Sequence, residues 1–535
     1  MATPTSPLPL PRSRTDAPPA IRAGARLTLA TIVATIGPAS QSPDVLRRLV
    51  LAGVNVVRFN FSHGTEAEHA QRLTAVRQAS RDVSIPVAVL GDLPGPKTRL
   101  TKVPEPGIDL QPGHDVTIDP NLAEAIPGET PRLGCTIPGI AASVHPGHKV
   151  LINDGAVRLL CVERERGDAP QSIRCRVVVG GLITTGKGVN FPQSELSIRA
   201  MSERDWQWAR WAVDNDLDYL ALSFVRSAEE VQELKRFLLD RARDRGVLDA
   251  SGQPLGIPVV AKIEKPQAVT EIDAIADASD ALMVARGDLG VETDVAQVPV
   301  IQKRIIACAD ARGKPCIVAT QMLETMITAS TPTRAEASDV ANAIFDGAEA
   351  VMLSGETAVG KHPVLVVETM KRIVGVAEAE LAARAAGAHP ITPALPTRIV
   401  EPARVRTAAL AEAAWHAART WNARLIAVWS QEGGAARFLS QSGINLPILA
   451  FSSSDRATRR MQLYRGVTAI RMDTPPTLAD WNLEVDRRAA ALEMAHAGDP
   501  IVLVAGIPIG QRGSPSAVAL HRIGEHAGGF AQHRC

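Results

Sequence analysis

Charged and hydroxyl-bearing side chains stand where short apolar runs of this sequence end. These runs have the length and β-branched composition of buried strands. If the runs form one parallel barrel, their carboxyl ends meet at one rim and the side chains there converge. Seven runs end in such residues, which are Arg58, Asn60 and Ser62; Asp92; Ser223; Lys262 and Glu264; Arg286 and Asp288; Thr320 and Gln321; Ser354 and Glu356. One polar strand end is commonplace, but seven converging ends predict an active site.

The residue types indicate metal-assisted chemistry on an acidic substrate. Glu264 and Asp288 are hard oxygen ligands of the kind that hold Mg²⁺ or Mn²⁺ together with substrate oxygens. The sequence has no histidine cluster, which argues against a zinc hydrolase. Lys262 precedes Glu264 by two residues, so both side chains point to the same face of a strand. Arg58, Arg286 and Lys262 add positive charge around the metal, which suits a phosphorylated substrate.

Lys262 leaves two reactions open. A lysine beside a divalent metal could be a Schiff-base nucleophile, as in aldolases. It could instead stabilise a transferring phosphoryl group electrostatically, which the combination of metal and phosphorylated substrate favours.

The elements that carry these residues alternate between apolar runs and amphipathic stretches. Helix start signals follow several runs, for example Ser202-x-x-Asp205. The pattern predicts an α/β fold, a (β/α)₈ barrel built from 28–95 and 188–375, together about 250 residues as is usual for such barrels. The eight expected strands are Thr31–Gly37, Val54–Phe61, Ile85–Leu93, Tyr219–Val225, Pro258–Glu264, Ala281–Leu289, Pro315–Met322 and Ala350–Thr357.

Other segments differ from the barrel in character. Residues 96–187 combine many turn pairs with short alternating runs, which predicts an inserted all-β domain after strand three. Residues 376–400 are rich in Ala, Pro and Gly and are expected to be a linker. Residues 401–535 alternate again and predict a separate open α/β domain. The Pro-rich residues 1–27 are expected to be a disordered tail.

Composition excludes several classes of partner. The formal net charge is +1 and aromatics are 3% of the residues, which argues against nucleic-acid partners. No apolar run is long enough to span a bilayer, so no membrane partner is expected. The six cysteines form no C-x-x-C pair, which indicates buried thiols in a reducing compartment, the cytoplasm. Only 11 of the 58 basic residues are lysine, so each lysine at a site deserves its own explanation.

Several of these segments resemble pyruvate kinases in order and spacing, over about residues 28–535. The matching segments are TIVATIGPAS, VRFNFSHG, GDLPGPKTR, KGVNFP, VVAKIE, VARGDLGVE, ATQMLETM, PTRAEASDVANAIFDGAEAVMLSGETAVGKHP and AGIPIGQRG. The resemblance implies transfer of the phosphoryl group of phosphoenolpyruvate to ADP, giving pyruvate and ATP, the last step of glycolysis. It also implies a homotetramer and a lid formed by the inserted β domain.

Site roles follow from the same resemblance. Arg58 matches the arginine that grips the phosphoryl group, and Lys262 matches the lysine that stabilises the transition state. Glu264 and Asp288 match the ligands of Mg²⁺ or Mn²⁺. The backbone at Gly287 and Asp288, together with Thr320, matches the substrate carboxylate site. The resemblance assigns Asn60, His63, Arg99 and Lys187 to the nucleotide-phosphate side. We expect Ser354 and Glu356 either to be structural or to support the groups that relay the proton to the enolate.

A monovalent-cation site, usually for K⁺, is implied at Asn60, Ser62, Asp92 and the Leu93 carbonyl. K⁺-dependent relatives resemble D-T-K-G-P-E where this chain has Asp92-Leu93-Pro94-Gly95-Pro96-Lys97. The ammonium of Lys97 replaces a glutamate and can supply the charge that K⁺ otherwise provides. We therefore expect activity without K⁺.

The C-terminal domain also departs from sugar-phosphate-activated relatives. Its loop Ser430–Ala436 has one hydroxyl and a carboxylate, Glu432, which would repel phosphate. We expect no activation by fructose 1,6-bisphosphate. Two alternatives remain, a metal-dependent lyase of pyruvate-type acids and a catalytically silent paralogue. Arg99 and Lys187 favour the kinase over the lyase, and the presence of Lys262 and Thr320 argues against a silent paralogue.

Overall fold

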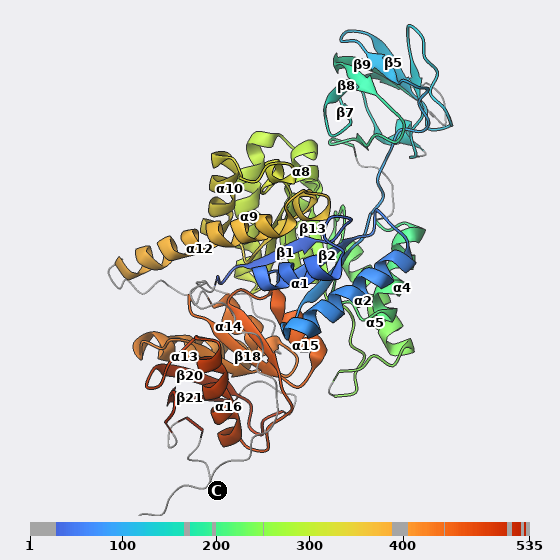
Figure 1. Cartoon of the computed structure of the whole chain (residues 1–535). Helices are drawn as coiled ribbons and strands as arrows, with labels where there is room; N and C mark the ends of the chain where they lie inside the picture. The colour runs from blue at the N-terminus through green and yellow to red at the C-terminus, as the bar shows by residue number, and fades with distance from the viewer. Residues whose placement is uncertain are drawn as a thin grey trace, which may run out of the picture.

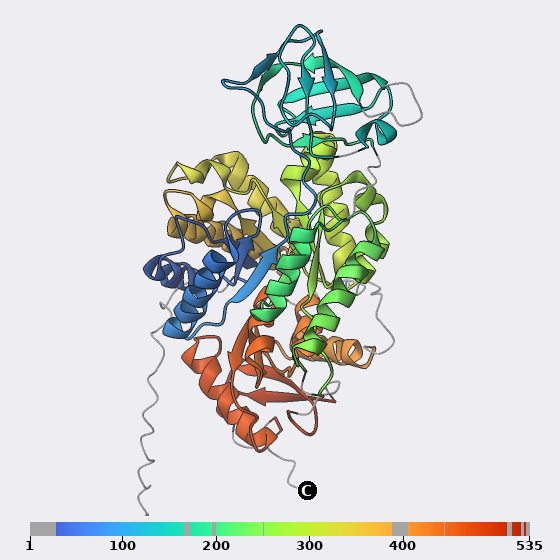
Figure 2. The same ribbon diagram turned by 90° about the vertical axis from the view of Figure 1, so that its right-hand side faces the viewer.

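The computed structural model describes residues 28–137, 139–164, 172–194, 200–249, 251–387, 405–442, 445–510, 516–525 and 529–530. The expected tail at residues 1–27 lies outside this range. A central barrel carries a β-rich domain at one end and an α/β domain at the other (Figure 1). A quarter turn of the molecule shows the same succession of three bodies (Figure 2).

The barrel is closed and entirely parallel, which confirms the predicted fold class. Strand β1 pairs with both β2 and β16, so the sheet has no free edge. The eight apolar runs supply its strands, which are β1 Thr31–Thr35, β2 Val56–Asn60, β3 Ala88–Asp92, β12 Tyr219–Leu222, β13 Val259–Ile263, β14 Ala281–Ala285, β15 Cys316–Ala319 and β16 Ala350–Leu353.

Strand periodicity divides the barrel core into two layers. Met283 on β14 points into the barrel, whereas its neighbours Leu282 and Val284 pack against the surrounding helices. The surrounding helices are α1 Pro43–Ala52, α2 Glu66–Val83, α4 Glu203–Asp214, α5 Ala228–Asp244, α6 Pro266–Thr270, α7 Ile272–Ala278, α8 Arg286–Glu292, α9 Val298–Ala311, α10 Arg334–Phe345, α11 Gly355–Ala358 and α12 Pro363–Gly387. Burial on both faces explains why the strands are continuous apolar runs.

Helix starts follow the capping signals of the sequence. Ser202 and Asp205 form a capping box at α4, as predicted. Thr65 with Glu68 and Thr333 with Glu336 do the same at α2 and α10. Each box satisfies backbone N–H groups that the first helical turn leaves free, so the helices begin at defined residues after the strand ends.

The inserted domain, here called the lid, has its own sheet and core. Its elements are β4 Ile108–Leu110, β5 Asp115–Ile118, β6 Arg132–Leu133, α3 Ile140–Ser143, β7 Lys149–Ile152, β8 Val157–Arg164, β9 Ile173–Val179, β10 Gly181–Ile183 and β11 Val189–Asn190. Six strands form one sheet in the order β11-β7-β8-β9-β5-β6. Because β11 pairs with β7, this sheet extends to Asn190, beyond the expected boundary at residue 187.

The C-terminal domain is an open five-stranded sheet in the order β19-β18-β17-β20-β21. Its elements are α13 Val405–Thr420, β17 Ile426–Trp429, α14 Gly434–Gln441, β18 Ile448–Ser452, α15 Asp455–Arg460, β19 Val467–Arg471, α16 Leu478–Ala491, β20 Pro500–Ala505 and β21 Ala517–Arg522. The antiparallel strand β21 was not expected from the sequence. Helix α12 continues to Gly387, so the first part of the expected linker is helical, and residues 388–404 lie outside the described range.

The C-terminal domain covers the amino-terminal end of the barrel. Arg459 pairs with Asp216 at 2.6 Å and with Asp218 at 2.8 Å, just before β12. The Tyr219 hydroxyl donates to the Arg460 carbonyl at 2.5 Å. The opposite, carboxyl end of the barrel faces the lid (Figure 2). Among the described helices, none is both long and apolar enough to cross a membrane.

Candidate active site

Four charged side chains from three strand ends meet at the carboxyl rim of the barrel. The Arg58 Nε atom lies 2.6 Å from Asp92 Oδ2. The Lys262 Nζ atom lies 3.2 Å from Asp92 Oδ1 and 2.9 Å from Glu264 Oε1. Lys262 also donates to the Ser223 hydroxyl at 2.6 Å. Because all four charged groups are largely buried, water screens these interactions little.

Neighbouring charges determine the protonation of this cluster. Burial disfavours the ammonium of Lys262, but Asp92 and Glu264 outweigh it and raise the lysine pKa above its ordinary value. Burial likewise disfavours the ionised form of Asp92, yet Lys262 and Arg58 hold its pKa below the ordinary value. Lys262 and Asp92 therefore remain a charged pair at neutral pH.

Glu264 is the least compensated group of the cluster. Burial raises its pKa, and the nearby carboxylate of Asp288 raises it further, while Lys262 opposes both. Its Oε2 atom accepts a hydrogen bond from the Phe224 N–H at 2.6 Å. Its buried Oε1 atom contacts Lys262 but has no hydrogen bond of good geometry. A buried carboxylate with a free lone pair beside a second carboxylate fits a hard divalent cation.

The donor set around Glu264 and Asp288 is small. In the described part of the chain, no group of three or more His, Cys, Asp or Glu residues could hold a metal ion. Two carboxylates would leave most positions of a divalent ion for water and substrate oxygens, which is the usual arrangement for Mg²⁺ at phosphate-handling sites.

Arg286 does not face the substrate region, contrary to our expectation from its position at a strand end. Its guanidinium donates to the Thr320 carbonyl at 2.6 Å and pairs with Asp339 on α10 at 2.6 Å. It also donates to the Gln321 carbonyl at 3.2 Å. Thr320 and Gln321 have φ values of 67° and 53°, a left-handed conformation that a β-branched residue such as Thr320 rarely adopts. The hydrogen bonds of Arg286 thus stabilise the strained turn at Thr320 and Gln321.

The strained turn after β15 brings Thr320 to the start of helix α8. The Gly287 N–H donates to Thr320 Oγ1 at 2.7 Å, and this hydroxyl donates to the Ala319 carbonyl at 2.6 Å. Thr320, Gly287 and Asp288, which the family resemblance assigned to one subsite, therefore lie together. Glu356 accepts hydrogen bonds from the Leu323 and Ser354 N–H groups, which agrees with its structural assignment.

Residues of the expected monovalent-cation site already have partners within the protein. Asn60 Oδ1 accepts from the Ser62 N–H at 3.1 Å, and the Leu93 carbonyl accepts from the Ser223 hydroxyl at 2.7 Å. Asp92 is paired as described above. Lys97 lies at the entry to the lid, with its Nζ atom 5.8 Å from the centre of the Phe224 ring.

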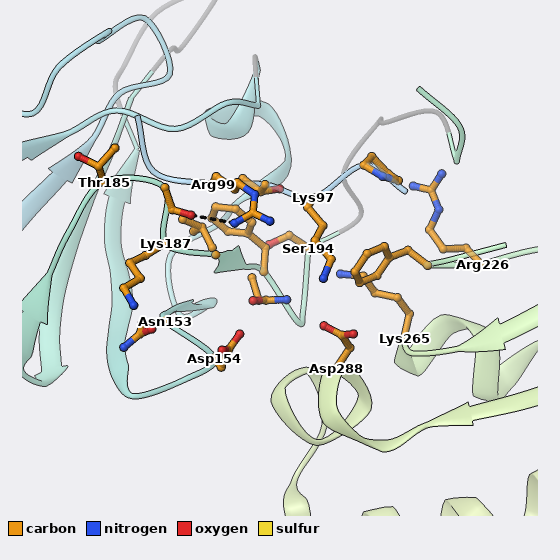
Figure 3. Close-up of a pocket in the computed structure, with 18 of the residues that line it drawn as sticks. Lys97, Arg99, Asn153, Asp154, Thr185, Lys187, Ser194, Arg226, Lys265 and Asp288 are labelled. Carbon is orange, nitrogen blue, oxygen red and sulfur yellow. Dashed lines mark hydrogen bonds between the residues drawn. The ribbon is translucent and has the colours of Figure 1, made fainter. Parts of the chain in front are cut away.

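A cavity of about 780 Å³ opens between the lid and the barrel. Arg99 and Lys187 line it from the lid, while Lys265 and Asp288 line it from the barrel (Figure 3). Arg99 is held by a hydrogen bond to the Gly186 carbonyl at 2.9 Å. The cavity is polar and cationic, which suits a bound polyphosphate.

Comparisons with known proteins agree with this geometry. Residues 27–367 match the family model described as pyruvate kinase, barrel domain, and residues 408–521 match that of the pyruvate kinase alpha/beta domain. The chain belongs to the pyruvate kinase family. It is 38% identical to a pyruvate kinase of Corynebacterium glutamicum over 92% of this chain and 97% of that protein. A pyruvate kinase of Mycobacterium tuberculosis is 39% identical over 92% of this chain and 98% of its own length. The crystal structure of a pyruvate kinase from Cryptosporidium parvum superposes with a TM-score of 0.81 at 29% identity, covering 93% and 96% of the two chains.

Within this pyruvate kinase fold, the expected nucleotide group is divided. Arg99 and Lys187 line the cavity, whereas Asn60 and His63 are not among its lining residues. His63 lies in the turn after β2, where its carbonyl lies 2.9 Å from Nε2 of the buried His69. Sequence reasoning missed Phe224 and Lys265. Lys265 directly follows Glu264 and is one of few lysines, so the lysine scarcity could have drawn attention to it.

Proposed function

We propose that this chain transfers the phosphoryl group of phosphoenolpyruvate to ADP, giving pyruvate and ATP. The observation that carries the proposal is the buried Lys262 ammonium, held between Asp92 and Glu264 beside Arg58 at the carboxyl rim of the barrel. A fixed positive charge in a poorly hydrated site stabilises charge that develops on a transferring phosphoryl group. Both charges are oriented before substrate binds, so little reorganisation accompanies the reaction.

The substrate roles that we propose are those that the family resemblance implies. Arg58 grips the phosphoryl group and Lys262 stabilises the transition state. The backbone at Gly287 and Asp288, together with Thr320, binds the substrate carboxylate at the start of α8. Glu264 and Asp288 would hold Mg²⁺ or Mn²⁺, which would neutralise charge on the carboxylate and phosphoryl oxygens when bound. Thr320 also lies beside the path of the proton that reaches the enolate carbon, with water as the immediate donor.

The nucleotide lies on the lid side. Arg99 and Lys187 contact the ADP phosphates across the cavity, and Asn60 and His63 complete that side from the barrel. Movement of the lid toward the rim would bring the two groups together and exclude water during transfer.

A coupled assay of pyruvate release tests the proposal. With phosphoenolpyruvate, ADP and Mg²⁺ or Mn²⁺, we expect pyruvate and ATP in equal amounts, with no activation by fructose 1,6-bisphosphate. The second expectation rests on the loop Ser430–Ala436, which has one hydroxyl and the carboxylate of Glu432. No pyruvate under these conditions would contradict the kinase, whereas ADP-independent release from a larger keto acid would indicate a lyase.

We further propose that Lys97 makes the enzyme independent of K⁺. Its ammonium stands over the Phe224 ring, and Lys97 lines the same cavity as Asp288, one of the two proposed metal ligands. The wild type should be equally active with K⁺ and with tetramethylammonium. Lys97→Glu should lose activity by about tenfold or more without K⁺ and regain part of it with K⁺, because an electrostatic contribution of this kind is worth one to a few kcal/mol.

Lys149→Glu, the same charge change at an exposed lid lysine, is the matched control and should leave the K⁺ response unchanged. Strong activation of the wild type by K⁺ would show that Lys97 does not replace the cation.

The family also suggests a homotetramer in the cytoplasm. Exposed apolar side chains such as Val295, Val300 and Phe345 are available for subunit contacts on the barrel helices. Light scattering on the purified protein measures the mass directly, and a monomer would contradict the tetramer.

A further inference from the structure

Two cysteines face each other in the core of the lid, and the proposed reaction uses neither of them. Cys161 on β8 and Cys175 on β9 are direct partners in the antiparallel ladder. They are 1% and 0% exposed, respectively, and both belong to the hydrophobic core of the lid. Along both strands the inward positions alternate with outward ones, so the two thiols lie on the same inner face of the sheet.

The backbone hydrogen bonds define the type of pair. The Cys161 N–H donates to the His148 carbonyl at 2.9 Å, and its carbonyl accepts from the Gly147 N–H at 2.8 Å, so both groups point away from β9. On β9, the Val177 N–H and carbonyl bond to His114 and Gly113 on the opposite side, toward β5. Cys175 lies two residues earlier on the same strand, so its backbone N–H and carbonyl also point toward β5. Cys161 and Cys175 are therefore a non-hydrogen-bonded pair.

Such pairs bring Cα atoms to about 4.5 Å, the closest approach in an antiparallel sheet. A disulfide requires a Cα separation of about 4.4–6.8 Å, so these residues need no backbone movement to form one. A register shift lies directly after Cys161, between Cys161 and Glu163. Regular pairing is interrupted there, which gives the ladder a place to open locally.

The thiols also differ in acidity. A hydrogen bond from the Cys175 thiol lowers the pKa of Cys161 below its ordinary value, although burial opposes the effect. The same interaction and burial raise the pKa of Cys175. Cys161 is thus the thiol of the pair that ionises first and attacks an oxidant, with Cys175 adjacent to its sulfur.

We propose that Cys161 and Cys175 are an oxidative modification site at which a peroxide links β8 to β9 through a reversible disulfide. The Cys161 thiolate attacks the peroxide, the O–O bond breaks, and a sulfenic acid and water form once a proton is taken up. Cys175 then attacks the Cys161 sulfur, the S–S bond forms, and the S–O bond breaks to release a second water. Two thiols lose two hydrogens in total, and the peroxide accepts both electrons.

The remaining described cysteines provide internal controls. Cys135 lies in the same core, but its partner in the ladder is Leu100. Cys316 is buried in the barrel, and Cys308 lies beside Arg312 at its surface. None of these three has a cysteine as its strand partner in the described ladders. Oxidation should therefore link Cys161 with Cys175 selectively.

The experiment treats the full-length protein with a small molar excess of hydrogen peroxide, then alkylates it under denaturing conditions and maps the peptides without reduction. We expect one cross-linked peptide pair that contains Cys161 and Cys175, lighter by two hydrogens, and dithiothreitol should restore both free thiols. The oxidised protein should also show a higher melting temperature than the reduced protein, because the bond restricts the unfolded lid.

Cys175→Ser should abolish the cross-link and leave Cys161 as a sulfenic or sulfinic acid. The wild-type map decides the question even if this variant folds poorly. If Cys161 and Cys175 are both alkylated after peroxide treatment, the proposal is overturned. A bond from Cys161 to any cysteine other than Cys175 would overturn it as well. Because the readout is a covalent mass, it is independent of whether the kinase assignment is correct.

Discussion

Replacement of Lys262 by methionine should lower kcat for pyruvate formation by about 10²–10³-fold, the usual loss when one preorganised electrostatic donor is removed from an active site. The methionine side chain fills a similar volume but cannot place positive charge near the transferring phosphoryl group. The KM for phosphoenolpyruvate should change much less, because Arg58 and the carboxylate subsite remain. Steady-state kinetics with both substrates varied measures the two effects separately.

The same substitution should also change stability. Asp92 keeps its pair with Arg58 at 2.6 Å, but Glu264 loses its cationic neighbour and remains buried. Loss of one partner from a buried ion pair costs about 3–5 kcal/mol. We expect protonation of Glu264 to relieve part of this cost. The loss of stability relative to the wild type should therefore be smaller at acidic pH than at neutral pH.

Lys235→Met is the matched control for Lys262→Met. Lys235 pairs with Asp280 at 3.0 Å but is more exposed, on helix α5. The Lys235→Met variant should retain full kcat and lose little stability, since surface ion pairs contribute about 0–1 kcal/mol. If Lys262→Met kept kcat within a few-fold of the wild type while remaining folded, Lys262 would have no part in transition-state stabilisation.

Arg286→Lys should lower kcat by about 10–100-fold, because a small misplacement of a substrate-orienting group costs on that order. The planar guanidinium donates to the Thr320 and Gln321 carbonyls and pairs with Asp339 at once. The lysine ammonium is a compact charge on one nitrogen and cannot reproduce this fork. Backbone strain at a position such as Thr320 costs about 1–3 kcal/mol and persists only while its surroundings hold it. Without the fork, the turn should relax and move the Thr320 hydroxyl away from Gly287.

A second substitution distinguishes positioning from general destabilisation. Serine tolerates a positive φ better than threonine. The double variant Arg286→Lys, Thr320→Ser should therefore have a higher kcat than Arg286→Lys alone. Asp339→Asn removes one partner of Arg286 and should have a smaller effect than Arg286→Lys. An unchanged kcat in Arg286→Lys would mean that the turn holds its conformation without the arginine.

Much of the barrel could be predicted from local patterns. Continuous apolar strands, capping boxes such as Ser202 with Asp205, and polar strand ends are properties of neighbouring residues, so they can be read along the chain. Strand β21 was missed although Gly510, Gly513 and Pro515 before it signal a turn, because it pairs with β20 at the edge of the sheet and local sequence does not show that pairing. Its side chains alternate little in burial, so periodicity gives no warning of it.

By itself, the sequence determined which residues reach the carboxyl rim, since strand order and side-chain alternation are built into it. Lys262 and Glu264 could be assigned to one face on that basis alone, whereas Asp288, expected on a strand, lies in helix α8 after the end of β14. Only the tertiary structure decided what each group contacts there. Arg286 turns to Thr320 and Asp339 because the loop after β15 and helix α10 offer acceptors that lie far away in sequence.

The lid cysteines illustrate the same division. The sequence places Cys161 and Cys175 in the inserted β domain, but their pairing depends on the register between β8 and β9, including the irregularity after Cys161. A shift of one residue would turn either thiol to the opposite face of the sheet. Register is a property of two chain segments packed together on one core, and it emerges only when the lid folds.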